Sequence, residues 1–203
     1  MTHPPLGGAH PLTEKVKKKN RSQHKEDTMT AIANHETVTI EDIATALPGL
    51  FDAWDAGEFS AQHASDLARF MNRKLSVRDA FVVHVISPKT SREDLMLLAI
   101  HPHTVRAQTM MDRIITETFT SGDFDSVHVL REGQAMADLT PGIPADIPCA
   151  NIESLTAYLL WWAGDLPDAM EHAAAALELD ERCSLASIVI AAIRKGMVTT
   201  SRS

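Results

Sequence analysis

"WWAGDLPDAMEHAAAALELD", residues 161–180, decides the fold because it combines the end of one helix, a tight turn and the start of another. Gly164 can take the left-handed conformation that ends a helix, and Asp165 can begin the next one. The helix before the turn carries one apolar face: Ile152, Leu155, Leu159 and Trp162. The helix after it carries Ala169, Ala173, Ala176 and Leu177, whose alanines let helix axes approach closely. This pattern predicts a packed helical hairpin, and it leaves no nucleophile, base or ligand set unexplained.

The same turn pattern recurs earlier in the chain. "GEF" at 57–59 and "GDF" at 122–124 repeat the order glycine, acid, apolar residue, so Gly57 and Gly122 are also predicted to end helices. Three predicted helix starts pair a hydroxyl with an acid three residues later, which caps exposed backbone N–H groups: Thr39 with Asp42, Ser76 with Asp79, and Ser91 with Asp94. Both signals are typical of consecutive antiparallel helices.

Hydrophobic periodicity predicts a chain of helices from Val38 onward. We expect them at 40–46, 48–56, 60–73, 77–86, 92–100, 104–120, 124–138, 152–163, 167–179 and 184–195. Pro48 is placed at the first position of the second helix, which proline tolerates. "FVVHVI" at 81–86 is rich in β-branched residues, so a short strand is the alternative there, but the preceding "SVRDAF" favours a helix.

The predicted fold class is all-α, with stacked antiparallel helical hairpins that resemble a tetratricopeptide repeat at the C-terminal end. Residues 1–36 lack periodicity and are predicted to form a disordered basic tail, and the chain's native start at Met29 is an open alternative. Residues 37–139 form a predicted helical subdomain, and the proline-rich segment 140–150 is a loop. Residues 151–197 contribute the last hairpin and a final helix, so 37–197 is expected to be one continuous domain.

Charge is distributed unevenly along the 203 residues. Residues 1–28 carry six Lys or Arg and three acids, and the remaining residues carry 13 Lys or Arg against 24 acids, a net charge of −11. An acidic body repels phosphate, so the sequence argues against direct nucleic-acid binding by the folded part. The longest apolar runs are too short to span a membrane, so no membrane association is expected.

Sequence motifs for chemistry are missing. There is no phosphate-binding loop, dinucleotide-binding motif, nucleophile elbow or zincin motif, so we predict no catalytic residues and no cofactor. His101 and His103 lack a third ligand nearby, and Cys149 and Cys183 lack zinc spacing, so no metal site is predicted. Two cysteines without a disulfide framework favour a cytoplasmic location.

The last third of the chain resembles two known patterns. "GDLPDAMEHAAAALELD" resembles a single tetratricopeptide repeat over 151–180, although Glu181 stands where such a repeat usually has proline. "YLLWWAGDLPDAMEHAAAALELDERCSLASIV" and "VRDAFVVHV" resemble the actinobacterial family called domain of unknown function 4192. That resemblance implies an all-helical fold and a bacterial origin. It implies no chemistry, and the family's usual N-terminal portion has no counterpart here.

Three functions remain open from the sequence. The preferred one is a non-enzymatic protein-interaction or regulatory protein of an actinobacterium or its mobile elements, whose partner is another protein. The alternatives are an acidic phage- or plasmid-encoded inhibitor that occupies a basic surface of a host enzyme, and an enzyme without a recognisable motif. We predict partner contacts at Trp54, Arg78, Asp79 and Trp161, structural turns at Gly57, Gly122, Gly164 and Asp165, and leave a homodimer open.

Overall fold

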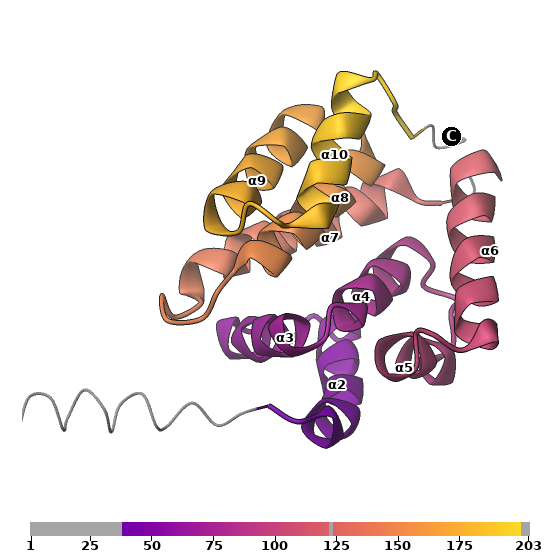
Figure 1. The fold of residues 1–203 in the computed structure, drawn as a ribbon, viewed down its shortest axis with the longest axis vertical. Coiled ribbons are helices and arrows are strands. Elements are labelled where there is room, and N and C mark those ends of the chain that lie inside the picture. The colour runs from indigo at the N-terminus through magenta and orange to yellow at the C-terminus, as the bar shows by residue number, and fades with distance from the viewer. Residues whose placement is uncertain (1–37, 122–123, 200–203) are drawn as a thin grey trace, which may run out of the picture. The chain divides into compact units, whose positions relative to one another are not determined.

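The computed structural model describes residues 38–121 and 124–199, which belong to one compact unit that begins at Val38. Within these residues the chain forms nine α-helices and one short 3-10 helix, and no strand. The all-α prediction is therefore confirmed (Figure 1). The predicted tail at 1–36 and the predicted turn at Gly122 lie outside the described residues.

The helices run in chain order with short connections. Their bounds are α2 Ile40–Asp55, α3 Ala61–Arg73, α4 Ser76–Ile86, α5 Arg92–Ile100, α6 Val105–Ser121, α7 Ser126–Leu139, α8 Ala150–Ala163, α9 Leu166–Leu179 and α10 Ser184–Arg194. The stretch 81–86 is helical, as preferred from the sequence. The 3-10 helix η1 covers Thr140–Gly142, and the rest of the proline-rich segment up to Cys149 is irregular.

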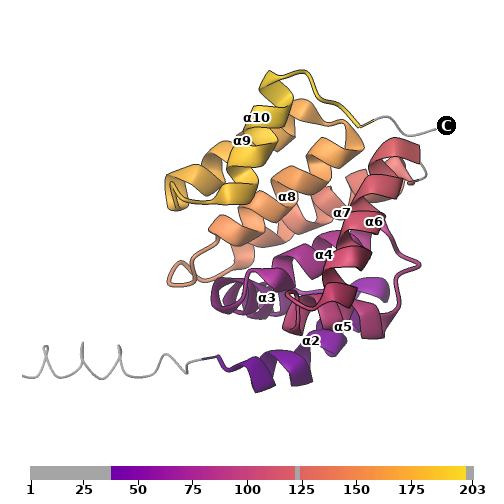
Figure 2. The same ribbon diagram turned by 45° about the vertical axis from the view of Figure 1, so that its right-hand side comes forward.

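Helix α8 lies at the centre of the C-terminal part of the fold. It packs against α7 on one side and against α9 and α10 on the other, as Figures 1 and 2 show, and it also contacts α3 and α4. Its predicted apolar face, Ile152, Leu155, Leu159 and Trp162, is buried. Gly133 of α7 permits close packing, because a Cβ atom there would lie only 3.1 Å from a side-chain carbon of Leu160.

The predicted hairpin between α8 and α9 is present. Gly164 has φ of +90°, the N–H of Asp165 donates to the carbonyl of Leu160, and the N–H of Gly164 donates to that of Trp161. This pair of hydrogen bonds is a Schellman turn, which satisfies carbonyls that the helix end leaves free. The Asp165 side chain then accepts from the N–H of Asp168 and caps α9. Gly57 ends α2 in the same way at φ +69°.

Two local predictions were wrong. Residues 40–55 form one helix with Pro48 inside it, not two helices that divide at Pro48. Ser76 does not cap α4: Leu75 occupies the cap position, and the Ser76 hydroxyl donates to the carbonyl of Ala99 at the end of α5. Capping by Thr39 and Ser91 is confirmed, since each accepts from the N–H of the acid three residues later.

Candidate functional site

Helix α6 presents more apolar surface than the core covers. Ala107, Met110 and Ile114, at helical spacing along one face, are buried. A second row, Met111, Ile115 and Phe119, follows at intervals of four residues beside the first. Met111 and Ile115 are half-buried and Phe119 is 38% exposed. The second row is therefore only partly covered by the rest of the fold.

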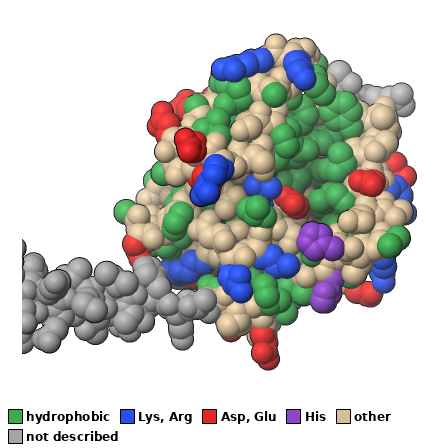
Figure 3. Space-filling model, viewed as in Figure 1, with side chains coloured by type: hydrophobic (Ala, Val, Ile, Leu, Met, Phe, Trp, Pro, Cys, Tyr) green, Lys and Arg blue, Asp and Glu red, His purple; other side chains and the backbone are tan. Residues whose placement is uncertain are grey.

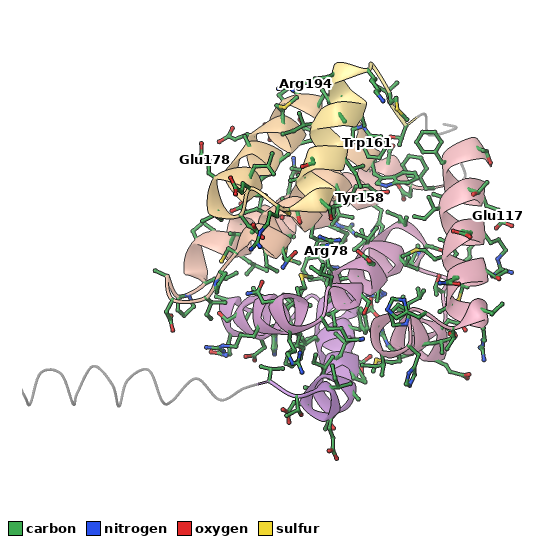
Figure 4. The ribbon with its side chains drawn as sticks, viewed as in Figure 1. Arg78, Glu117, Tyr158, Trp161, Glu178 and Arg194 are labelled. Carbon is green, nitrogen blue, oxygen red and sulfur yellow. The ribbon has the colours of Figure 1, made fainter. Side chains whose placement is uncertain are left out.

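Aromatic residues of α8 form the opposite wall. The ring of Phe119 stacks on that of Trp161 with centroids 6.3 Å apart, and Tyr158 lies 5.5 Å from Trp161 by the same measure. Figure 4 places Tyr158 and Trp161 between α10 and α6, and Figure 3 shows hydrophobic side chains gathered in a hollow at that place. We call Met111, Ile115, Phe119, Tyr158 and Trp161 the apolar groove.

The segment after α10 holds the Trp161 wall in place. The indole N–H of Trp161 donates to the carbonyl of Met197 at 3.0 Å. The hydroxyl of Thr199 donates to the carbonyl of Trp162. Burial leaves Trp161 only 4% exposed, while the neighbouring Met197 is 44% exposed. The groove thus has a rigid aromatic wall on α8 and an exposed apolar rim.

The groove becomes acidic toward the start of α6. A hollow of about 400 Å³ there is lined by Ser76, Asp79, Leu98, Pro102, Ala107, Gln108, Met111 and Asp112. The carboxylate of Asp79 binds the buried Arg78 guanidinium at 3.1 Å, and Arg78 also donates to the side-chain oxygen of Asn151 at 3.3 Å. Asp112 is exposed and has no ion-pair partner among the described residues. One end of the groove therefore favours a cationic neighbour.

The residues predicted to contact a partner do not form one exposed patch. Trp54 is buried among aromatic rings: its ring centroid lies 4.8 Å from that of Phe59 and 5.1 Å from that of Phe81. Neither of these two residues belongs to the apolar groove. Arg78 is buried behind Asp79. The structure brings only Asp79 and Trp161 to the groove, one at its acidic end and one in its wall.

Sequence reasoning missed most of the groove, although a signal for it exists. Met111, Ile115 and Phe119 widen the apolar face of α6 beyond the stripe that a core needs. The same periodicity that located the helix would have found this second row. Tyr158 carries no such signal, because α8 is buried on all sides and its apolar residues do not single out one face.

A histidine and two aspartates meet Arg92 near the end of α2. The His84 Nε2 atom lies 2.9 Å from an Asp55 carboxylate oxygen, and Arg92 binds Asp52 and Asp55 at 2.9 and 2.7 Å. Burial lowers the pKa of His84, and Arg92 lowers it further, while Asp55 opposes the shift. The imidazole packs edge-on against Phe51, so the pair lies against the core and not in a hollow that a substrate could enter.

A second hollow, of about 420 Å³, lies where α4 and α6 end and α7 begins. Its polar groups include Ser87, Lys89, Glu117, Thr118, Asp125 and His128. The His128 ring contacts Glu132 at 3.3 Å and Arg131 at 3.0 Å. These groups mix both charges at an open surface, and they do not repeat any known catalytic arrangement.

Within residues 38–121 and 124–199, no three His, Cys, Asp or Glu side chains lie close enough together to hold a metal ion. None of the helices described there has the length and apolar character that crossing a membrane requires. Comparison of the chain with protein-family models, with curated proteins and with solved structures finds no match. The resemblance to domain of unknown function 4192 therefore stays a prediction.

Proposed function

We propose that this protein is a non-enzymatic interaction or regulatory protein that binds an amphipathic helix of another protein in the apolar groove. The observation that carries the proposal is the row Met111, Ile115 and Phe119 on α6, which is not fully buried and whose last member, Phe119, stacks on Trp161 of α8. A groove between helices that exposes aromatic and aliphatic side chains is a common receptor for the apolar face of a helix.

The charges around the groove specify the partner further. Asp79 and Asp112 lie at one end, and the body of the chain is strongly acidic. A partner helix with apolar residues on one face and Lys or Arg at one end fits this arrangement, because opposite charges steer association and fix the direction of binding. We place this function in the cytoplasm of an actinobacterium, in keeping with the family resemblance and the two free cysteines.

An acidic inhibitor of a basic surface has less support. Such a protein needs acidic side chains gathered on one face. On the face that Figure 3 shows, Asp and Glu are scattered among Lys and Arg, and hydrophobic side chains form a larger patch than either charge does. The apolar groove is therefore the better basis for a function.

The test compares three forms of the full chain as bait in cells of its source. Phe119→Asp adds a charge to the groove, and Val127→Asp adds the same charge at a 76% exposed apolar residue of α7. We expect at least one protein to be recovered with the wild type and with Val127→Asp but lost with Phe119→Asp. A photo-crosslinker at residue 119 should then label an amphipathic helix with basic residues in that protein.

Thermal melting of the three purified baits shows whether they are equally folded. If the same proteins are recovered with all three folded baits, the groove does not bind them, and the proposal fails. Labelling of an acidic or non-helical segment would also contradict it.

A further inference from the structure

Helix α10 is the last helix of the described chain, and its outer face is unusual. Its residues 184–193 contain no charged side chain. Leu185, Ala186, Val189 and Ala192 are buried, and the helix packs against α8 and α9. The opposite face exposes Ser184, Ser187, Ile188 and Ala191, and Ile188 is 54% exposed. This outer face is uncharged: its only polar groups are the hydroxyls of Ser184 and Ser187, and Ile188 is a large apolar side chain exposed in its middle.

Charges are placed symmetrically about Ile188. Glu181 precedes it by seven residues and Lys195 follows it by seven, and both are exposed. Glu178 and Arg194 do not share this equal spacing, but they have the same signs at the same ends: Figure 4 shows Glu178 on α9, which leads into α10, and Arg194 at the far end of α10. Among the described residues, none of these four side chains takes part in an ion pair. Three acids, Glu178, Asp180 and Glu181, therefore precede the helix together with Arg182, which pairs with Asp180 at 3.5 Å, while the middle of the helix is uncharged and its end is basic.

We propose that a second copy of this chain docks on the outer face of α10, with the two α10 helices antiparallel about a two-fold axis at Ile188. That axis brings Ile188 of each copy together and places Lys195 of one copy across from Glu181 of the other, twice per dimer. The small side chains of Ser184, Ser187 and Ala191 let the two helix axes come close. The neutral middle of the face also suits two chains that each carry a large negative charge.

Charge complementarity favours a second copy over a different partner. In an isologous interface, residue i of one copy contacts residue j of the other copy, and residue j of the first contacts residue i of the second. Ion pairs therefore form across it only if one face carries an acid and a base on opposite sides of the two-fold axis. Glu181, in the turn before α10, and Lys195, at the end of α10, have the signs that this requires, and each lies seven residues from Ile188 along the sequence. The proposal is independent of the apolar groove, which belongs to α6 and α8. A single short helix gives a small interface, so we expect a weak dimer whose population depends on concentration.

The first experiment is sedimentation equilibrium of the full chain over a range of concentrations. We expect the average molecular mass of the wild type to rise with concentration, from the 22.2 kDa of one chain toward twice that value. Ile188→Glu should stay monomeric, whereas the control Val127→Glu should dimerise like the wild type. A wild type that stays monomeric throughout, or an Ile188→Glu variant that still dimerises, overturns the proposal.

Charge reversal tests the antiparallel geometry. Glu181→Lys and Lys195→Glu should each raise the dimer Kd by roughly three- to tenfold, because two exposed ion pairs are lost per dimer. The double variant should return to within about twofold of the wild type, since the pairs re-form with exchanged signs. If the single variants leave the dimer Kd unchanged, or if the double variant has a higher Kd than either single variant, the antiparallel arrangement is contradicted. Circular dichroism confirms that each variant is folded.

Discussion

Gly164 shows how one backbone conformation fixes the direction of two helices. Its φ of +90° is a region that residues with a Cβ rarely adopt, yet a Cβ there would have open space around it. Gly164→Ala should therefore destabilise the fold by about 1–2 kcal/mol through backbone strain alone. Gly49 lies inside α2 with ordinary dihedral angles and open space, so Gly49→Ala should stabilise by about 0.5–1 kcal/mol. Urea unfolding of both variants measures the change in the free energy of unfolding relative to the wild type. Two changes of the same sign would contradict the prediction.

His172 links α9 to α8 through a hydrogen bond of 2.6 Å to Glu153. That hydrogen bond raises the pKa of His172, partial burial opposes it, and the charges of Glu153, Glu171 and Asp168 add to the rise. The folded protein therefore binds the His172 proton more tightly than the unfolded chain does. The resulting stability is fully present below the unfolded pKa of about 6.5 and is lost as the pH rises through the folded pKa.

The measurement compares wild type with Glu153→Gln by urea unfolding at a series of pH values. We expect the wild type to be the more stable at low pH, and the difference to shrink as the pH rises. His84 has the opposite dependence, because burial lowers its pKa, but it is present in both proteins and cancels in the comparison. A difference that does not vary with pH would show that His172 is not the titrating group.

Side-chain caps were predictable only where both partners are local. Thr39 and Ser91 each find their N–H partner three residues along the chain, so spacing alone identifies them. Ser76 has the same spacing to Asp79, but its hydroxyl donates to Ala99, 23 residues away. The same limit applies to His84 and His172, whose acidic partners lie on other helices. A local sequence pattern therefore does not predict contacts between residues of different helices.

At the scale of the element, α2 shows that burial can override a helix breaker. Proline removes a backbone hydrogen bond and crowds the preceding turn, which suggested two helices. The buried residues Ile43, Leu47, Leu50, Phe51 and Trp54 nevertheless form one stripe that continues past Pro48. Because both halves bury the same face against the core, they stay one helix. The continuous stripe was the better indicator.

Helix α8 buries a large side chain, Trp162, whereas α9 buries the small side chains Ala169, Ala173 and Ala176. Trp162 is 1% exposed among the rings of Phe119, Phe124 and Tyr158, so Trp162→Ala should leave a cavity and cost about 3–5 kcal/mol. Ala176 is fully buried, so Ala176→Leu should overpack the contact and cost about 1–3 kcal/mol.

Ala174→Leu is the matched control for overpacking. Ala174 lies on the same helix but is exposed, so the added carbons meet solvent and the effect should stay within about 0.5 kcal/mol. Urea midpoints of the three variants decide between packing and a ligand site. Unchanged midpoints for Trp162→Ala and Ala176→Leu would mean that these two residues do not contribute to the packing of the core.

At the scale of the molecule, helix order was predictable but the groove was not. Each helix carries its own apolar period, and Gly57 and Gly164 carry their own turn signals. The groove depends on how α6 is placed against α8, two helices separated along the chain by α7 and the proline-rich segment. Their contact through Phe119 and Trp161 is tertiary, so no window of sequence contains it.

Stability should differ across the molecule because the helices differ in how much they bury. Ten residues of α8 are buried, on all sides of the helix, and it packs against α7, α9 and α10. Helix α6 packs against α4 and α5 and leaves Gln108, Asp112 and Thr116 exposed along its outer side. Elements with few buried contacts open locally, at a lower free energy than global unfolding.

Native-state hydrogen exchange should therefore show faster exchange in the middle of α6 than in the middle of α8, by at least about tenfold. The two helices span 17 and 14 residues, so end fraying cannot account for a slower α8. Phe119→Asp should accelerate exchange in α6 alone, because Phe119 joins α6 to the α8 wall through Trp161. A helix that fills the apolar groove should slow exchange in α6 toward the rate of α8. Equal protection of α6 and α8 in the free protein would show instead that α6 is as firmly packed as the core and that the groove is already closed.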